Sequence, residues 1–237
     1  MNKKINLIII KILISYSKIQ IKYLMQVPTN YEDIIKLLIV GDSSVGKTNF
    51  ITQFIDNKFD DNYNPSNGFD NKISFLNIDK KLIKLQIWDS IGNEKDLSLN
   101  RSLFLKVQGI ILIYDISNLD SFEHIVNWIK YIKNVNDNIP IILVANKCDL
   151  YEERIVTQKE GNDLAINYNF TFVETSAKNN INVKTTFIKI CEEIIAKAEM
   201  RMNSIDSDIM DDDDRPYYLR ELIPYKDKRK NKKCCCC

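Results

Sequence analysis

The stretch Gly41-Asp42-Ser43-Ser44-Val45-Gly46-Lys47-Thr48 constrains the fold of this 237-residue chain more than any other feature. It matches the pattern G-x-x-x-x-G-K-[ST], which wraps backbone N–H groups around phosphates. An apolar run, Ile34–Val40, precedes it and predicts a buried strand, and a helical pattern runs from about Lys47 to Lys58. A helix that starts in this loop aims its positive end at the same anion. The sequence therefore predicts a nucleoside triphosphate site, and a solvated loop is the less favoured interpretation.

Each residue type in this loop has a chemical reason to be there. Gly41 and Gly46 let the backbone approach the phosphates closely. Lys47 supplies a positive charge to the β- and γ-phosphates, and Thr48 offers a hydroxyl to Mg²⁺. The expected ligands are thus a nucleotide and magnesium.

The rest of the pattern predicts an α/β fold. Polar residues 60–70 indicate a loop, after which Lys72–Ile78 and Leu82–Trp88 are expected to form a hairpin that turns at Asp79-Lys80. A helix is expected before Val107. Further strands are predicted at Ile110–Tyr114, Ile139–Val144 and Phe170–Glu174, with helices at about 120–135, 157–168 and 183–197. This alternation predicts a P-loop NTPase fold, with a six-stranded, mostly parallel sheet, one antiparallel edge strand, and helices on both faces.

Asn146-Lys147-Cys148-Asp149 follows a predicted strand and indicates which base is bound. An aspartate at this spacing can accept both the N1–H and the N2 amino group of guanine, a pair that adenine does not offer. Two charge-assisted hydrogen bonds of roughly 1.5–3 kcal/mol each would favour guanine by about two to four orders of magnitude. Alone, these four residues could also be a solvated turn. Ser176-Ala177-Lys178 follows the last predicted strand, so the loops converge on one crevice at the carboxyl ends of the strands.

Asp89-Ser90-Ile91-Gly92 closes the strand that ends in Trp88. Asp89 can hold Mg²⁺ through a water, and the Gly92 N–H can reach a γ-phosphate. With this element the order GxxxxGKT, DxxG, NKxD, SAK is complete over about residues 33–198, and in it the chain resembles the Ras-like small GTPases.

Within that superfamily the chain is most similar to the Rab family. The P-loop, the runs 84–89 (KLQIWD) and 112–117 (LIYDIS), and the two base motifs with their flanks, 146–150 (NKCDL) and 174–178 (ETSAK), are close to Rab usage. The resemblance implies a monomeric switch in vesicle trafficking that hydrolyses GTP to GDP with a positioned water. It also implies exchange factors, GTPase-activating proteins and effectors as partners, and residence on the cytoplasmic face of a membrane with a cytosolic pool.

The resemblance implies further roles at four positions. Phe59 falls on the aromatic residue that stacks on guanine, and Tyr63 on the tyrosine that closes over the phosphates. Ser66 stands where the family has a threonine that binds Mg²⁺, and Asn93 stands where it has the water-orienting glutamine, which predicts slow hydrolysis. The candidate nucleotide-binding residues are Gly41, Asp42, Ser43, Ser44, Val45, Gly46, Lys47, Thr48, Asn49, Phe59, Tyr63, Ser66, Asp89, Gly92, Asn146, Lys147, Asp149, Ser176, Ala177 and Lys178. Thr48, Ser66 and Asp89 are the candidate metal ligands, and Lys47 and Asn93 the candidate catalytic residues.

Other departures fall in the same switch regions, at Asn67–Asn71, Ile91, Lys95-Asp96 and Leu103–Val107. They leave the identity of regulators and effectors open. An alternative function is a nucleotide-binding membrane scaffold that hardly hydrolyses GTP. A P-loop kinase or ATPase is disfavoured by the NKxD and SAK motifs.

The C-terminal residues form a second candidate site. Four of the six cysteines are the last four residues, and a basic run, Lys226–Lys233, precedes them. This favours prenylation with a polybasic contribution, although C-a-a-X is a poor match. A metal-binding or disulfide tract is the alternative, and the isolated Cys148 and Cys191 indicate a reducing compartment. The Rab resemblance implies geranylgeranyl groups on Cys236 and Cys237.

The balance of charged residues and the sequence pattern also limit how the chain can be organised. Lys plus Arg (33) nearly balances Asp plus Glu (32), so bulk binding to nucleic acid is not expected. We expect an irregular leader at 1–32, the GTPase domain at 33–202 and a flexible tail at 203–237. The leader contains no membrane span or clear cleavage site, and it fits either a basic helix on a membrane surface or a true start at Met25. His124 is not expected to be a ligand or base, Cys148 is interpreted as a spacer, and Cys191 as core packing.

Overall fold

The computed structural model describes residues 31–61, 70–90 and 101–204. The strands are β1 (Asp33–Val40), β2 (Asp70–Ile78), β3 (Lys81–Asp89), β4 (Gly109–Asp115), β5 (Ile141–Asn146) and β6 (Thr171–Glu174). The helices are α2 (Lys47–Asp56), α3 (Arg101–Phe104), α4 (Leu119–Glu123), α5 (Ile125–Val135), the 3₁₀ turn η3 (Tyr151–Glu153), α6 (Gln158–Tyr168) and α7 (Val183–Ser204). None of the helices in these ranges has the length and apolarity of a membrane span.

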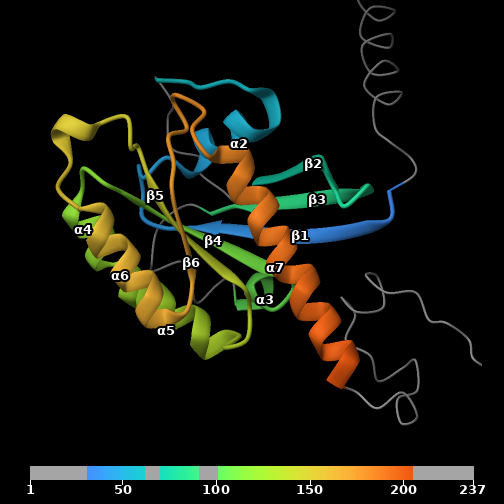
Figure 1. Cartoon of the computed structure of the whole chain (residues 1–237). Coiled ribbons are helices and arrows are strands. Elements are labelled where there is room, and N and C mark those ends of the chain that lie inside the picture. Colours follow the sequence, from blue (N-terminus) through green and yellow to red (C-terminus); the bar gives the residue numbers. More distant parts are fainter. Residues whose placement is uncertain (1–30, 62–69, 91–100, 205–237) are drawn as a thin grey trace, which may run out of the picture. The chain divides into compact units, whose positions relative to one another are not determined.

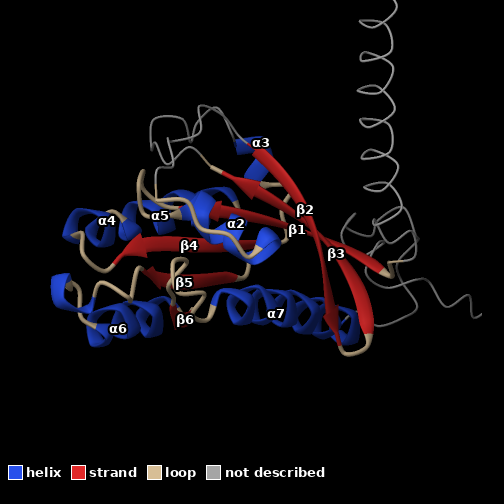
Figure 2. Ribbon diagram, turned by 90° about the horizontal axis from the view of Figure 1, so that it is seen from above, coloured by secondary structure: helices blue, strands red, loops and turns tan. Residues whose placement is uncertain are grey.

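The strands form one six-stranded sheet in the order β2-β3-β1-β4-β5-β6 (Figure 2). The edge strand β2 is antiparallel to β3, and all other neighbours are parallel. The predicted fold class, a mostly parallel sheet with one antiparallel edge, is confirmed. Parallel strands bring their carboxyl ends to one edge of the sheet, and the loops after β1, β5 and β6 carry the predicted motifs there.

The predicted hairpin is also present. Asp79 and Lys80 both have positive φ, 48° and 67°, as a two-residue type I′ turn requires. Asp tolerates this backbone region better than most residues, because its short side chain can bond locally. The turn places Asp70 opposite Asp89, the residue that ends β3.

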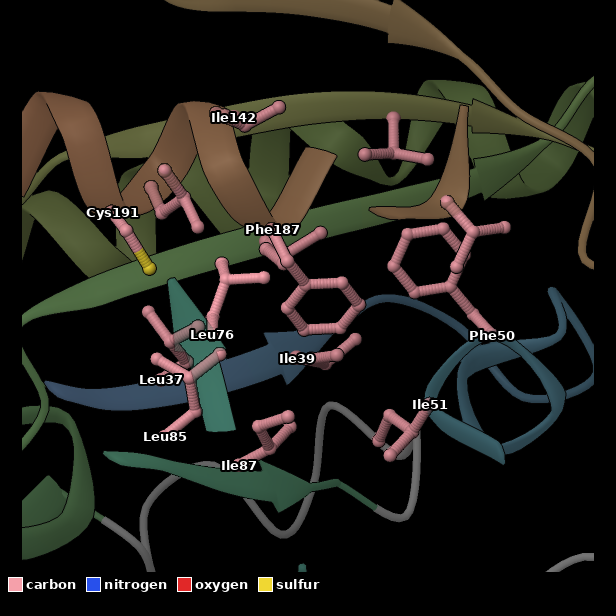
Figure 3. Close-up of a cluster of buried hydrophobic side chains, with 14 of the residues drawn as sticks. Leu37, Ile39, Phe50, Ile51, Leu76, Leu85, Ile87, Ile142, Phe187 and Cys191 are labelled. Carbon is pink, nitrogen blue, oxygen red and sulfur yellow. The ribbon is translucent and has the colours of Figure 1, made fainter. Parts of the chain in front are cut away.

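Successive residues of β1 point to opposite faces of the sheet and so belong to two separate cores. Leu37 and Ile39 pack against α2 and α7, where the Phe50 and Phe187 rings stack at 5.4 Å (Figures 1 and 3). All four side chains are fully buried. This packing fixes the start of α2, and with it the loop that precedes the helix.

The opposite face of the sheet is covered by α3, α5 and α6. Leu38 and Val40 of β1 share this core with Trp128 and Ile129 of α5. Apolar positions of α5 recur at Ile125, Trp128, Ile129 and Ile132, the spacing of a one-sided helix. Helices on both faces of the sheet thus agree with the prediction.

Several boundaries differ from those expected, and three of the differences have a clear physical reason. The predicted helix 120–135 is divided into α4 and α5 at His124, whose carbonyl accepts from the N–H groups of both Asn127 and Trp128 in a tightened turn. Strand β5 starts at Ile141 rather than 139, because Pro140 has no N–H to donate to a ladder. Helix α7 continues to Ser204, since residues 198–204 contain good helix formers and no glycine or proline.

Candidate functional site

A pocket of about 380 Å³ lies where the loops after β1, β5 and β6 meet. Its walls contain twelve of the predicted nucleotide-binding residues: Ser43, Ser44, Gly46, Lys47, Thr48, Asn49, Phe59, Asn146, Lys147, Asp149, Ala177 and Lys178. Gly41, Asp42, Val45, Asp89 and Ser176 are bonded to, or next in sequence to, these lining residues. Tyr63, Ser66, Gly92, Asn93, Cys236 and Cys237 lie outside the described residues.

The loop 41–48 depends on glycine at two places. A Cβ on Gly41, which has φ of 142°, would lie 2.0 Å from the carbonyl oxygen of Ile113 in β4. Gly46 has φ of 97° and sits beside the Asn146 side chain, where a Cβ would be 2.6 Å from Nδ2. Gly46 is also the N-cap of α2 and offers no side chain to the free N–H groups of the first turn. These N–H groups are therefore left for an anion.

Lys47 lies at the base of the loop and is largely buried. Its Nζ donates to the carbonyl oxygens of Gly41 at 2.9 Å and Asp42 at 2.6 Å. Burial lowers the pKa of Lys47 to about 8, while the carboxylates of Asp89 and Asp42 oppose this shift. A bound phosphate would stabilise the ammonium form in the same way as these carboxylates do.

Thr48 and Asp89 form the part of the site that fits a magnesium ion. The Thr48 hydroxyl donates to Asp89 Oδ2, so the hydroxyl oxygen keeps its lone pairs for a cation. Asp89 Oδ1 is buried and makes no hydrogen bond in the described part of the chain. Burial raises the pKa of Asp89, which a divalent cation would offset. Among the described residues, no group of three or more His, Cys, Asp or Glu side chains is placed to hold a metal ion.

The end of the pocket at which the sequence predicts base binding, here called the base end, is organised around Asp149. Its Oδ1 accepts from the Ser176 hydroxyl at 2.5 Å, and Ser176 Oγ in turn accepts from the Asn179 N–H at 2.9 Å. Ser176 is fully buried, whereas Asp149 is half-buried and lines the pocket. This chain of hydrogen bonds orients the carboxylate through Ser176, which is 27 positions away in sequence.

Asn146 connects the two ends of the site. Its Nδ2 donates to the carbonyl of Val45 at 2.9 Å, and its Oδ1 accepts from Thr175 Oγ1 at 3.1 Å and from the Ala177 N–H at 3.3 Å. The side chain is almost completely buried. One amide thus joins the phosphate loop to the loop after β6, a contact over 101 residues that the sequence pattern did not reveal.

Lys147 lies between these two motif residues with φ of 65°. Its Nζ forms an ion pair at 2.7 Å with Asp115, the last residue of β4. Ser44 in the facing loop also has positive φ, 65°. Non-glycine residues in this backbone region cost free energy and are concentrated at functional sites.

Asp42 is held from outside the pocket. Its carboxylate accepts from Trp128 Nε1 at 2.9 Å and lies 2.6 Å from Nδ1 of His124. Only the backbone of Asp42 is therefore available on the phosphate side of the loop. His124, which was not expected to be a ligand or base, thus contacts the loop although it lies 82 residues away. The break between α4 and α5 falls at this histidine, and the sequence contained no signal for that break.

Asp60, Asp61, Ser90 and Leu150 also line the pocket and were not predicted to do so. All four are close in sequence to a predicted site residue, which was the available signal. Burial raises the pKa of the Cys148 thiol, consistent with its interpretation as a spacer rather than a nucleophile. Cys191 is fully buried in the core, as expected.

Residues 36–196 match the Ras family. The chain is 41% identical over 172 residues to the GTP-binding protein yptV2 of Volvox carteri, which covers 72% of this chain and 79% of that protein. It is 39% identical over 174 residues to Ras-related protein Rab-8 of Diplobatis ommata, an alignment that covers 73% of this chain and 83% of that protein. It is 36% identical over 196 residues to human Ras-related protein Rab-3A, an alignment that covers 82% of this chain and 89% of that protein.

Proposed function

This chain belongs to the Ras family of small GTPases and is Rab-like, and from that premise we propose that it is a GTP- and GDP-dependent switch on membranes, in vesicle trafficking. One observation carries the proposal: Lys47 and Thr48 of the phosphate loop line the same pocket as Asp149 of the base motif. A P-loop kinase or ATPase does not need an aspartate that recognises guanine, such as Asp149. The named relatives supply the trafficking part of the proposal.

The reaction we propose is hydrolysis of GTP to GDP and phosphate by a positioned water. The backbone N–H groups of the loop 41–48 and the Lys47 ammonium would hold the phosphates and stabilise the charge that develops on them. Thr48 and Asp89, together with Ser66, would hold Mg²⁺, which when bound supplies further positive charge at the phosphates. Phe59, lining the pocket, is proposed to lie against the base.

Competition binding tests the nucleotide assignment. The purified chain should bind GTP and GDP far more tightly than ATP, because Asp149 accepts two hydrogen bonds that adenine does not donate. Asp149→Asn replaces one acceptor with a donor and should move the preference toward xanthine nucleotides. Equal affinity of the wild-type chain for ATP and GTP would contradict the proposed function.

Slow intrinsic hydrolysis is the second part of the proposal. Asparagine is one methylene shorter than glutamine, so the Asn93 amide would stop about 1 Å short of the attacking water, a misplacement that can cost about 10²-fold in rate. Asn93→Gln should accelerate single-turnover hydrolysis several-fold or more while GDP affinity stays the same. If neither protein hydrolyses GTP even with activating proteins, the alternative of a hydrolysis-deficient membrane scaffold is favoured.

Membrane attachment is proposed to depend on lipid at Cys236 and Cys237. Each buried methylene contributes about 0.8 kcal/mol, so two prenyl chains hold a protein firmly where one holds it marginally. Replacing both cysteines by serine should release the protein to the cytosol, since the basic run 226–233 alone is screened at physiological salt. Deletion of residues 1–24 is the companion test, and a double serine variant still on membranes would assign attachment to that leader.

A further inference from the structure

The segment Asn57–Asp61, here called the strap, forms one wall of the nucleotide pocket. It begins where α2 ends, with Asn57 in the left-handed region at φ of 52° as the C-cap. From there Phe59, Asp60 and Asp61 line the pocket. A bound nucleotide would therefore touch a segment that has no regular secondary structure of its own.

Asn49 fixes this strap to the first turn of α2. Its Nδ2 donates to the carbonyl oxygen of Asp60 at 2.9 Å, and its Oδ1 lies 3.4 Å from the N–H nitrogen of the same residue and accepts from it. One amide side chain thus satisfies both backbone groups of Asp60. One N–H and the oxygen of the Asn49 amide are used in this contact, while its backbone N–H, in the first turn of α2, is left for a phosphate.

Other contacts also hold the strap, and the partly buried Phe59 packs against the core cluster that contains Phe50 and Phe187. Asn180 Nδ2 donates to Asn57 Oδ1 at 2.9 Å, at the start of the strap. Lys178 lies 3.6 Å from Asp61, but both side chains are more than half exposed, at 54% and 72%. Exposed ion pairs of this kind contribute little. Asn49 makes two hydrogen bonds to the backbone of Asp60, a strap residue that lines the pocket.

We propose that Asn49 is a positioning residue that slows nucleotide release by holding the strap against the pocket at Asp60. The inference rests on the proposed function and concerns the regulation of the same site. Asn49 directly follows Thr48, so the clamp joins the wall of the pocket to the turn that is proposed to hold the β-phosphate and magnesium. Loss of the clamp removes these two bonds to the Asp60 backbone and loosens the strap at this point without touching the base motif.

The test compares Asn49→Ala with Asn162→Ala, the same change at an exposed helical position of α6, none of whose residues lines the pocket. Full-length protein is loaded with fluorescent GDP and magnesium, and release is followed after adding excess GDP. Two partly solvated neutral hydrogen bonds predict that Asn49→Ala releases GDP about five-fold faster or more. Asn162→Ala should release GDP at the wild-type rate.

Hydrogen exchange of the GDP-bound proteins separates the clamp from a general loss of stability. Amides of residues 57–61 should exchange faster in Asn49→Ala, whereas those of α6 and β5 should be unchanged. Faster release with unchanged exchange in the strap would overturn the inference, as would faster exchange with unchanged release. A wild-type chain that binds no guanine nucleotide would instead overturn the proposed function and the inference with it.

Discussion

The two ends of the pocket are built differently. At the base end, Ser176 orients Asp149 through a hydrogen bond, and Asp115 orients Lys147 through an ion pair. Both Asp149 and Lys147 also line the pocket. At the phosphate end, Lys47 donates to carbonyl oxygens of its own loop. The base end thus has its proposed binding groups in place, whereas Lys47, at the proposed phosphate end, makes internal contacts that a ligand would have to replace or share.

This difference assigns different tasks to the two ends. Groups that are already oriented discriminate between bases, because a wrong base leaves them unpaired. A lysine that exchanges backbone carbonyls for phosphates contributes mainly affinity, which all nucleoside di- and triphosphates share. Changes at the phosphate end should therefore alter affinity, and changes at the base end should alter the preference for guanine.

The largest expected effect is that of Lys47→Ala. Loss of two or more charge-assisted hydrogen bonds to phosphate should weaken GDP and GTP binding about 10²-fold to 10⁴-fold. The ratio of the affinities for GDP and for xanthosine diphosphate (XDP) should stay the same, since Asp149 is unchanged. Isothermal titration with both nucleotides measures affinity and ratio together.

Two controls sharpen that measurement. Lys130→Ala removes an exposed lysine of α5 and should leave both affinities unchanged. The nucleotide-free Lys47→Ala protein should unfold at about the wild-type temperature or above it, because burial already opposes the charge of Lys47 and lowers its pKa to about 8. A changed GDP to XDP ratio would show that the two ends are not separable.

An intermediate effect is expected for Asn146→Ala, which cuts the link between the two ends. The carbonyl of Val45 and the N–H of Ala177 would lose their buried partner, at about 1–3 kcal/mol for each unsatisfied group. We expect a lower unfolding temperature and weaker binding of every guanine nucleotide. Thr175→Val is the matched control, since it removes one of the three contacts of Asn146 and keeps the shape. An Asn146→Ala protein as stable as wild type would contradict the role of this amide as a cross-link.

The sequence predicted the sheet and the motif residues because both depend on patterns of residues that are close together in the sequence. Apolar runs predict strands such as Ile110–Tyr114 to within a residue or so at each end, and an Asp-Lys turn joins β2 to β3 as expected. The helix break at His124 was not predicted, since Asp120–Val135 has a continuous helical pattern. The break coincides with a tightened turn in which the His124 carbonyl accepts two hydrogen bonds, and helix propensity does not predict such a turn.

The contacts between motifs could not be predicted for a similar reason. The bonds from Asn146 to Val45, from Trp128 to Asp42 and from Ser176 to Asp149 join residues 101, 86 and 27 positions apart. No period or spacing in one sequence reports which side chains meet at that separation. Motifs thus predicted most of the residues that line the pocket, and the folded chain supplies how these are oriented.

The smallest effect is expected for Ser176→Ala, and it is the most direct test of the comparison. The Ser176 hydroxyl donates to Asp149 Oδ1, and the half-buried carboxylate can partly replace that donor with water. GDP affinity should therefore fall only about three- to ten-fold, below the full value of a charge-assisted bond. The preference for GDP over XDP should fall by the same factor, because a carboxylate that is no longer oriented pairs less well with N1–H and the N2 amino group. Ser117→Ala is the matched control: it removes a hydroxyl that donates at 2.7 Å to Asp115, which keeps its ion pair with Lys147, and should change either quantity less than two-fold. If Ser176→Ala instead weakens GDP and XDP equally, Ser176 supports the loop rather than the carboxylate, and the base end is no more specialised than the phosphate end.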